Sequence, residues 1–382
     1  MMITHLRLAN WRNFKHLDIS LSKRLIIVGP NGVGKSNLLD AFRFLRDVAT
    51  SGLSAAVDRR GGLSRVCCIS AANQNQGLID LDVTLTTGDI SWQYLLQFGA
   101  EGMGRQRTLV RQEIVKRNNE IILQRPDTHD DDDQDRLTQT ALEQTSANQA
   151  FRTIQQHFSR IGYVHLVPQI VREPGRLTAV QNDPFGSDFI ARINSVSAKT
   201  RQAWLKHISS ALQTAVPQLS DLDVTVDKQG APHLSAAYKH WPRDARQDER
   251  DLSDGELRLL GLLWSIVELQ SGDTLLLEEP ESSLDRGVVR VLPSLLSGTQ
   301  RHKSDAQIVL TTHSFDLLSD EGIAPNEVLL LTPTSDATTG ILACDIENVT
   351  AEIDAGLTIP EAIGHLIKPD GVEQLVPLMS GI

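Results

Sequence analysis

The 382-residue sequence is poor in cysteine and has no long apolar run. Its three cysteines, of which Cys67 and Cys68 are adjacent, are too few for a disulfide framework, which favours a reducing compartment. No apolar stretch reaches the ~18 residues that a membrane-spanning helix needs. The start, MMITHLRLANWRNF, lacks the apolar core and the small-residue cleavage site of a signal peptide. We therefore expect a soluble, cytoplasmic protein without a membrane partner.

Positive charge is also scarce. The chain has 37 Lys and Arg against 48 Asp and Glu, a formal net charge of −11, which argues against a protein that coats nucleic acid through its overall charge. A local basic face is still compatible with this balance. The length exceeds that of a typical single domain, so we expect either two lobes or one domain with a large insertion.

The stretch RLIIVGPNGVGKSNLLDAFRFL carries the strongest functional signal. An apolar run of strand type at 25–28 precedes a G-x-x-x-x-G-K-S motif, and apolar residues at helical spacing follow it. In such a loop the glycines let the backbone wrap a phosphate, Lys35 reaches the β- and γ-phosphates, and the Ser36 hydroxyl is a ligand of Mg²⁺. The predicted nucleotide-binding residues are Gly29, Pro30, Asn31, Gly32, Val33, Gly34, Lys35, Ser36 and Asn37.

A second acidic element is expected if the loop belongs to a nucleoside triphosphatase, and SGDTLLLEEPESSLD supplies it. A buried-strand run at 274–277 ends in Glu278 and Glu279, where open α/β sheets place their ligands. Adjacent strand residues point to opposite sides. We therefore assign Glu278 to Mg²⁺, directly or through water, and Glu279 to orienting and polarising the attacking water. Asp is the commoner residue at the first position, so Glu278 is a departure.

A further apolar strand at 308–311, in AQIVLTTHSFDLL, ends at Thr312, His313 and Ser314. A lone histidine is more often structural than catalytic. Because this one ends a strand of the same predicted sheet, we predict that His313 contacts the γ-phosphate or the attacking water. The predicted catalytic residues are thus Lys35, Glu279 and His313.

The stretch LSDGELRLLG changes from polar and turn-forming to apolar at helical spacing. Ser253 and Glu256 form a capping-box pattern, which satisfies two backbone donors at a helix start. A helix start preceded by small residues also offers free N–H groups and a positive dipole end to an anion. The residues alone leave open whether this stretch only caps a helix or also binds a phosphate.

Together, the phosphate loop, LSDGE, LLLEEPESSLD and TTHS resemble the ABC-type ATPase head of the SMC/RecF/OLD-like group, in particular small predicted AAA-type ATPases of prokaryotic defence loci. The opening ITHLRLANWRNFKHLDISLSKRLIIVGPNGVGKSN and the stretch AAVDRRGGLSRV are similar to the same group. The resemblance implies an α/β fold in which a mostly parallel sheet core is flanked by an antiparallel β-subdomain. It covers the two ends of the chain and is much less specific in the middle.

The resemblance also implies a mechanism with ATP and Mg²⁺. Two ATP molecules are sandwiched in a head-to-tail homodimer, and the signature of one subunit caps the γ-phosphate held by the other. Asp254 replaces a common glycine and has to point away from the phosphates. Asp285 matches the loop that couples the two sites, while Arg12 either approaches the phosphates or is a surface arginine. The signature residues are Leu252, Ser253, Asp254, Gly255 and Glu256.

The middle of the chain predicts a compact insertion. Alternating apolar residues indicate strands in LIDLDVTLTTG, SWQYLLQFG and RTLVRQEIVKR, helical segments follow at 136–160 and 186–214, and a strand pair surrounds DKQGAP. No sustained heptads occur, so no long coiled coil is expected. The predicted division is an ATPase core at 1–75 and 245–382, an antiparallel β-subdomain with an acidic loop at 76–130, and a mainly helical α/β lobe at 131–244.

Several charged or polar stretches are explained without assigning them a catalytic or metal site. The aspartates of THDDDDQDR, at Asp130, Asp131, Asp132 and Asp133, are expected in a solvated loop rather than a metal site. Gln74 and Gln76 lie where a glutamine loop would be sought, but SAANQNQG is interpreted as a polar turn. Basic residues enrich the lobe and indicate either a DNA-contacting face or solvated helices: Arg152, Arg160, Arg172, Arg176, Arg192, Lys199, Arg201 and Lys206.

Three functions follow from these motifs. The first is an ATP-gated dimeric switch or clamp in prokaryotic anti-phage defence or DNA maintenance, which controls a separate effector such as a Toprim-like nuclease. We expect a separate effector because too few residues follow His313 for a nuclease domain. The second is a RecF-like DNA-binding repair ATPase. The third, an ABC-transporter nucleotide-binding subunit, fits the large insertion and the RecF-like opening least.

Overall fold

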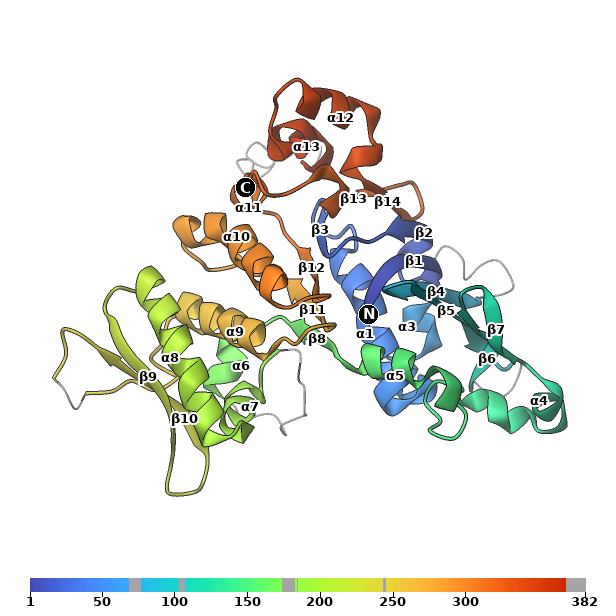
Figure 1. The fold of residues 1–382 in the computed structure, drawn as a ribbon, viewed down its shortest axis with the longest axis horizontal. Coiled ribbons are helices and arrows are strands. Elements are labelled where there is room, and N and C mark those ends of the chain that lie inside the picture. Colours follow the sequence, from blue (N-terminus) through green and yellow to red (C-terminus); the bar gives the residue numbers. More distant parts are fainter. Residues whose placement is uncertain (69–76, 103–106, 174–182, 184, 243–244, 369–382) are drawn as a thin grey trace, which may run out of the picture.

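The computed structural model describes residues 1–68, 77–102, 107–173, 183, 185–242 and 245–368. Three β-sheets organise these residues: an antiparallel sheet, a mostly parallel sheet and a small two-stranded sheet. Figure 1 shows the antiparallel sheet on one side of the parallel sheet and the lobe that carries the two-stranded sheet on the other. The predicted α/β fold class, with a parallel core and a flanking antiparallel sheet, is confirmed.

The antiparallel sheet has six strands in the order β2-β1-β4-β5-β6-β7. One face of each central strand is apolar and buried, as the alternating pattern predicted. β1 and β2 come from the start of the chain and pair with each other, and β1 also pairs with β4, so this sheet joins two segments that the sequence separates. Its strands are β1 (Met2–Trp11), β2 (Phe14–Ser20), β4 (Ile79–Thr87), β5 (Ile90–Ala100), β6 (Thr108–Arg117) and β7 (Glu120–Arg125).

The second sheet has the order β14-β13-β3-β12-β11-β8, and only the β13–β14 pair is antiparallel. Its central strands are apolar on both faces, because helices cover both sides of a parallel sheet. β8, at one edge, lies inside the segment that we expected to be a mainly helical lobe. The strands are β3 (Arg24–Val28), β8 (Ile161–Val164), β11 (Thr274–Glu278), β12 (Gln307–Thr311), β13 (Val328–Pro333) and β14 (Thr338–Leu342).

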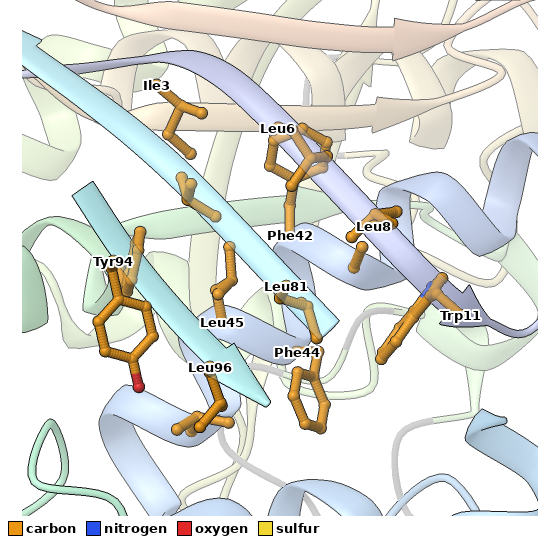
Figure 2. Close-up of a cluster of buried hydrophobic side chains, with 14 of the residues drawn as sticks. Ile3, Leu6, Leu8, Trp11, Phe42, Phe44, Leu45, Leu81, Tyr94 and Leu96 are labelled. Atoms are coloured by element: carbon orange, nitrogen blue, oxygen red, sulfur yellow. The ribbon is translucent and has the colours of Figure 1, made fainter. Parts of the chain in front are cut away.

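Helix α1 (Lys35–Ser51) lies between the two large sheets, and its side chains fill the main hydrophobic core. Figure 2 shows Phe42, Phe44 and Leu45 of this helix among side chains of the antiparallel sheet. The Trp11 and Phe44 ring centroids are 5.1 Å apart. This packing on both sides holds the helix that begins at the phosphate loop in a fixed position.

The other face of the parallel sheet is covered by helices from the second half of the chain, which form a separate core with it. A third core lies in the lobe, where Trp204 and Trp264 meet edge to face with their centroids 5.3 Å apart. The two-stranded sheet of the lobe is β9 (Leu219–Val226) with β10 (Pro232–Tyr238). The remaining helices are α2 (Leu53–Asp58), α3 (Leu63–Val66), α4 (Thr128–Asp132), α5 (Arg152–Ser159), α6 (Pro168–Arg172), α7 (Phe189–Ser195), α8 (Ala198–Ala215), α9 (Asp254–Glu268), α10 (Arg286–His302), α11 (Phe315–Leu318), α12 (Glu347–Asp354) and α13 (Ile359–Ile367), with 3₁₀ turns at Gln134–Thr138, Gln149–Phe151, Pro325–Glu327 and Ala343–Asp345.

Two expectations about the middle of the chain are wrong. The helix predicted at 136–160 is present only as α5, because the residues before it pack as turns against α2: Glu143 accepts hydrogen bonds from Leu53 N at 2.9 Å and from Thr140 Oγ1 at 2.8 Å. The acidic run is not a solvated loop throughout. Asp130 is 1% exposed, and both its oxygens accept from Arg125, at 2.8 and 3.0 Å.

The expectation of no long coiled coil is confirmed. Among the described residues the longest helix, α8, has 18 residues, so there is no long coiled-coil arm in this part of the chain. In the same ranges no helix combines the length and the apolar character needed to cross a membrane. The division into segments 1–75, 76–130, 131–244 and 245–382 stays a prediction.

Candidate nucleotide-binding site

The phosphate loop connects β3 to α1, as predicted, and its backbone needs glycine. Gly34 has a φ of +106°, and a Cβ there would lie 2.0 Å from Asn13 Nδ2. A Cβ on Gly29 would lie 2.5 Å from Leu331 O. Asn13, from the turn between β1 and β2, donates to Val33 O at 2.6 Å and accepts from Asn37 Nδ2 at 2.8 Å. The loop is therefore tied to the antiparallel sheet by a residue that the motif does not include.

Lys35 is the first residue of α1, and its side chain lies inside the loop. Its Nζ donates to Gly29 O at 3.1 Å and to Pro30 O at 3.2 Å, and the residue is 6% exposed. Burial lowers the pKa of Lys35, and the charges of nearby glutamates oppose this shift. The arrangement places a cation beside the backbone N–H groups of a helix start, an environment that favours an anion.

Glu278 ends β11 and meets Ser36 at the start of α1. The Ser36 hydroxyl donates to one oxygen of the Glu278 carboxylate, and the Tyr163 hydroxyl donates to the other. Serine and carboxylate oxygens are hard ligands of the kind that Mg²⁺ takes. No group of three or more His, Cys, Asp or Glu side chains is arranged for a metal in the described ranges. This donor set fits Mg²⁺, which is usually held by one or two protein groups with phosphate oxygens and water.

Glu279 follows directly and lies beside His313. The His313 Nε2 and Glu279 Oε1 atoms are 3.3 Å apart. Burial and the charge of Lys35 lower the pKa of His313, and the charge of Glu279 opposes them, so the imidazole is neutral near pH 7. The Glu279 backbone has a φ of +44°, and its N–H donates to Thr311 Oγ1 at 3.1 Å. Glu279 and His313, two of the three predicted catalytic residues, are thus neighbours at the ends of β11 and β12.

Two further polar side chains reach this site, and sequence reasoning missed both. Glu281 accepts from Thr312 Oγ1 at 2.6 Å and from the backbone N–H of His313 at 3.1 Å. Its second oxygen is buried without a hydrogen-bond partner, and burial raises the pKa of Glu281. The signal for it was its place two residues after Glu279. Tyr163 comes from β8, and the short apolar run IGYV was its only signal.

The signature segment forms the predicted helix start. Ser253 and Glu256 make both bonds of the capping box at the start of α9. Asp254, expected to point away from phosphates, forms an ion pair with Arg172 at 2.6 Å, and the same arginine donates to Leu252 O at 2.7 Å. Gly255 approaches the chain closely, since a Cβ there would lie 2.7 Å from Ser283 O.

Asp285 lies close to the signature. Asp285 and three signature residues, Ser253, Gly255 and Glu256, line a cavity of ≈ 540 Å³ between the lobe and α10. Asp285 caps α10 by accepting from Gly287 N at 2.7 Å. The dimer-coupling role of Asp285 and the phosphate-binding role of the signature stay predictions.

Arg12 is held against α1. It has a φ of +49°, and its Nε and Nη2 atoms donate to Asp40 Oδ2 at 2.9 and 2.5 Å. Asp40 also accepts both bonds of a bidentate pair from Arg60, at 2.9 Å each. Gln74 and Gln76 lie outside the described residues.

The sequence matches a known family over most of its length. The family model described as "AAA domain, putative AbiEii toxin, Type IV TA system" matches residues 25–320. A second model, "P-loop containing region of AAA domain", matches residues 3–46.

Curated relatives match over shorter stretches. The chain is 38% identical over 80 residues to the DNA replication and repair protein RecF of Corynebacterium jeikeium (strain K411), which is 20% of this chain and 18% of that protein. It is 41% identical over 46 residues to RecF of Bacillus mycoides (strain KBAB4), which is 12% of each. The match thus spans less than a fifth of the length of either relative.

The fold resembles that of a solved SMC head bound to the C-terminal winged-helix domain of ScpA. The TM-score is 0.56, the identity is 16%, and the match covers 89% of this chain and 98% of that one. The chain therefore belongs to the family of AAA-domain proteins described as putative AbiEii toxins of type IV toxin–antitoxin systems, and it has the fold of an SMC/RecF-like ABC-type ATPase head.

Proposed function

We propose that the protein binds ATP with Mg²⁺ at the phosphate loop and hydrolyses it. The observation that carries this proposal is the convergence of three strand ends on one helix start: Ser36 and Glu278 meet beside Lys35, and Glu279 lies next to His313. Mg²⁺, held by Ser36 and Glu278, would neutralise the charge of the phosphates. Lys35 would contact the β- and γ-phosphates from inside the loop.

Glu279 is proposed as the general base. Its carboxylate orients a water molecule and takes a proton from it, the water oxygen attacks the γ-phosphorus, and the bond to the bridging oxygen breaks, which yields ADP and phosphate. The neutral His313 has one donor and one acceptor nitrogen. It can therefore accept a hydrogen bond from the water, or donate one to the water or to a γ-phosphate oxygen.

We further propose that ATP closes two copies into a homodimer, in which the signature of one copy caps the γ-phosphate of the other. Two features support this arrangement. The signature offers the free N–H groups of a helix start. Arg172 neutralises Asp254, which removes an obstacle to phosphate binding. The family description supports a setting in genome defence, where the dimer would switch a separate effector such as a nuclease.

The test is the solution mass by light scattering, with and without Mg-ATP, together with phosphate release. Glu279→Gln is expected to bind ATP and accumulate as a dimer with turnover reduced by about 100-fold or more. Lys35→Ala is expected to stay a monomer. Glu321→Gln is the matched control and should behave as wild type, because Glu321 is exposed and its neighbour Gly322 contacts Arg24 at the start of β3, the strand end opposite the phosphate loop. Wild-type turnover by Glu279→Gln would remove the assignment of the base.

A RecF-like DNA-binding ATPase is the second candidate, and the RecF matches favour it. Two basic residues of the lobe form ion pairs within the chain: Arg172 with Asp254, and Arg192 with Glu268, each at 2.6 Å. They are therefore less available to phosphates of DNA. A DNA affinity that falls steeply with salt concentration would favour this candidate over the effector switch.

A further inference from the structure

Tyr163 is the part of the nucleotide site that no motif contains. It lies on β8, the edge strand, which pairs in parallel with β11 so that Tyr163 is opposite Leu276. Its hydroxyl donates to the Glu278 oxygen that Ser36 does not use. Both oxygens of this carboxylate are therefore taken by side chains from different elements, one at the start of α1 and one on β8.

We propose that Tyr163 is a positioning residue for Mg²⁺: its hydroxyl holds the Glu278 carboxylate so that the other oxygen stays beside Ser36. This inference rests on the proposed ATP and Mg²⁺ site and names a residue that determines its metal affinity. Tyr163 does not touch the metal or the nucleotide in this assignment. It acts only through Glu278.

The tyrosine ring is itself held in place. The guanidinium of Arg43, two turns along α1 from the phosphate loop, lies 4.3 Å from the ring centroid. The cation is attracted to the face of the ring, which favours this orientation of the tyrosine. Arg43 is in turn 3.9 Å from Asp40 on the same helix. The ring that carries the hydroxyl is therefore held by a residue of α1, the helix that also carries Ser36.

The length of the Glu278 side chain explains why such a support is needed. Glutamate has one more rotatable bond than aspartate, so a free carboxylate at this position would sample more positions relative to Ser36. A partner that fixes the outer oxygen removes this freedom before the metal arrives. Outer partners of metal ligands typically change metal affinity by about 10- to 100-fold when they are removed.

The experiment compares nucleotide binding with and without metal in the full-length protein. A fluorescent ATP analogue is titrated in EDTA and then at increasing Mg²⁺ concentration. Tyr163→Phe keeps the ring and its contact with Arg43 but removes the hydroxyl. Tyr94→Phe is the matched control, because its hydroxyl also donates to a glutamate, Glu113, at 3.1 Å, in the antiparallel sheet away from the site.

We expect Tyr163→Phe to bind the analogue in EDTA as wild type does, and to need about 10- to 100-fold more Mg²⁺ for the metal-dependent gain in affinity. Tyr94→Phe should leave the Mg²⁺ requirement unchanged. An unchanged Mg²⁺ requirement in Tyr163→Phe overturns the inference, and so does an equal loss of binding in EDTA, which would indicate a structural role. If wild type shows no binding of the analogue, the proposed function fails instead.

A double-mutant cycle adds a second readout. In Glu278→Asp the shorter side chain withdraws the carboxylate from the tyrosine hydroxyl. The effect of Tyr163→Phe on the Mg²⁺ requirement should then shrink to less than about 2-fold in this background, because the two changes remove the same interaction. If the two substitutions instead change the Mg²⁺ requirement by independent factors that multiply, the inference is contradicted.

Discussion

Arg60 provides the most direct test of how the site-bearing helix is held. Its side chain is 5% exposed and forms a bidentate pair with Asp40 and a 2.9 Å pair with Asp47, both on α1. Its guanidinium also lies 5.0 Å from the centroid of the Phe44 ring. The neighbouring Arg59 has the same chemistry but is 56% exposed, and its nearest contact with Asp47 is 3.6 Å.

Replacing Arg60 by methionine keeps most of the apolar volume and leaves two buried carboxylates with fewer partners. Removing one partner of a buried pair costs about 3–5 kcal/mol. Arg12 still pairs with Asp40, and Arg46 still pairs with Asp47 at 3.1 Å. We therefore expect the free energy of unfolding to fall by about 3 kcal/mol, near the lower end of that range. Arg59→Met should cost less than about 1 kcal/mol, as exposed pairs do.

The structure also predicts how the stability loss of Arg60→Met changes with pH. Burial tends to raise the pKa of Asp40, but the charge and hydrogen bonds of Arg60, with Arg12 and Arg43, outweigh it and lower this pKa below 3.8. In wild type, Asp40 contributes stability that is present above pH 3.8 and is lost as the pH falls through the lowered pKa. Without Arg60 the pKa of Asp40 rises, and its protonation relieves the unpaired charge. The deficit of Arg60→Met relative to wild type should thus shrink as the pH falls from about 7 toward 4.

The assay is unfolding by urea, monitored through tryptophan fluorescence at two or more pH values. Free energies of unfolding are compared only between variants with equal m-values. The reasoning is refuted if Arg60→Met costs no more than Arg59→Met. It is also refuted if the deficit grows as the pH falls.

Two further predictions concern buried polar groups. Burial lowers the pKa of His157 to about 4, against 6.5 in the unfolded chain, so between these pH values the unfolded state binds one more proton than the folded state. The free energy of unfolding should therefore fall by up to about 3 kcal/mol from pH 6.5 to 4. His157→Gln should flatten this part of the stability–pH curve, and an unchanged curve would contradict the assignment. Gln307 is fully buried, donates to Ile3 O at 2.7 Å and to Ser22 O at 3.0 Å, and accepts from Ile3 N at 3.2 Å. Gln307→Met should lower the free energy of unfolding by about 2–4 kcal/mol in urea, because it leaves these backbone groups unpaired; the exposed Gln156→Met should change it by less than about 0.5 kcal/mol.

The parts of the site that were predictable from the sequence are those in which a local pattern and a strand end coincide. The phosphate loop follows an apolar run and precedes a helix with a clear apolar face, and the strands before Glu278 and His313 are short continuous apolar runs. Parallel strands bring their carboxyl ends to one edge of a sheet, so order along the chain was enough to bring these residues together.

The parts that were missed depend on contacts between distant segments. Tyr163 and Glu278 are 115 positions apart, and β8 has only four residues, too few for a pattern to distinguish it from a loop. The burial of Asp130 was not predicted, because it depends on the ion pair with Arg125, five residues earlier. In each case the deciding interaction is a tertiary contact that composition and periodicity do not contain.

The backbone of Glu279 has a consequence for how this sequence can change. With a φ of +44° the residue occupies a left-handed conformation, which costs a non-glycine residue about 1 kcal/mol or more. Glycine or asparagine would adopt the same backbone at a lower cost but would lack the carboxylate. With Glu279 as the proposed general base, thermodynamic optimisation and the proposed activity oppose each other at position 279. A homologue that has given up ATP turnover would be free to gain stability there.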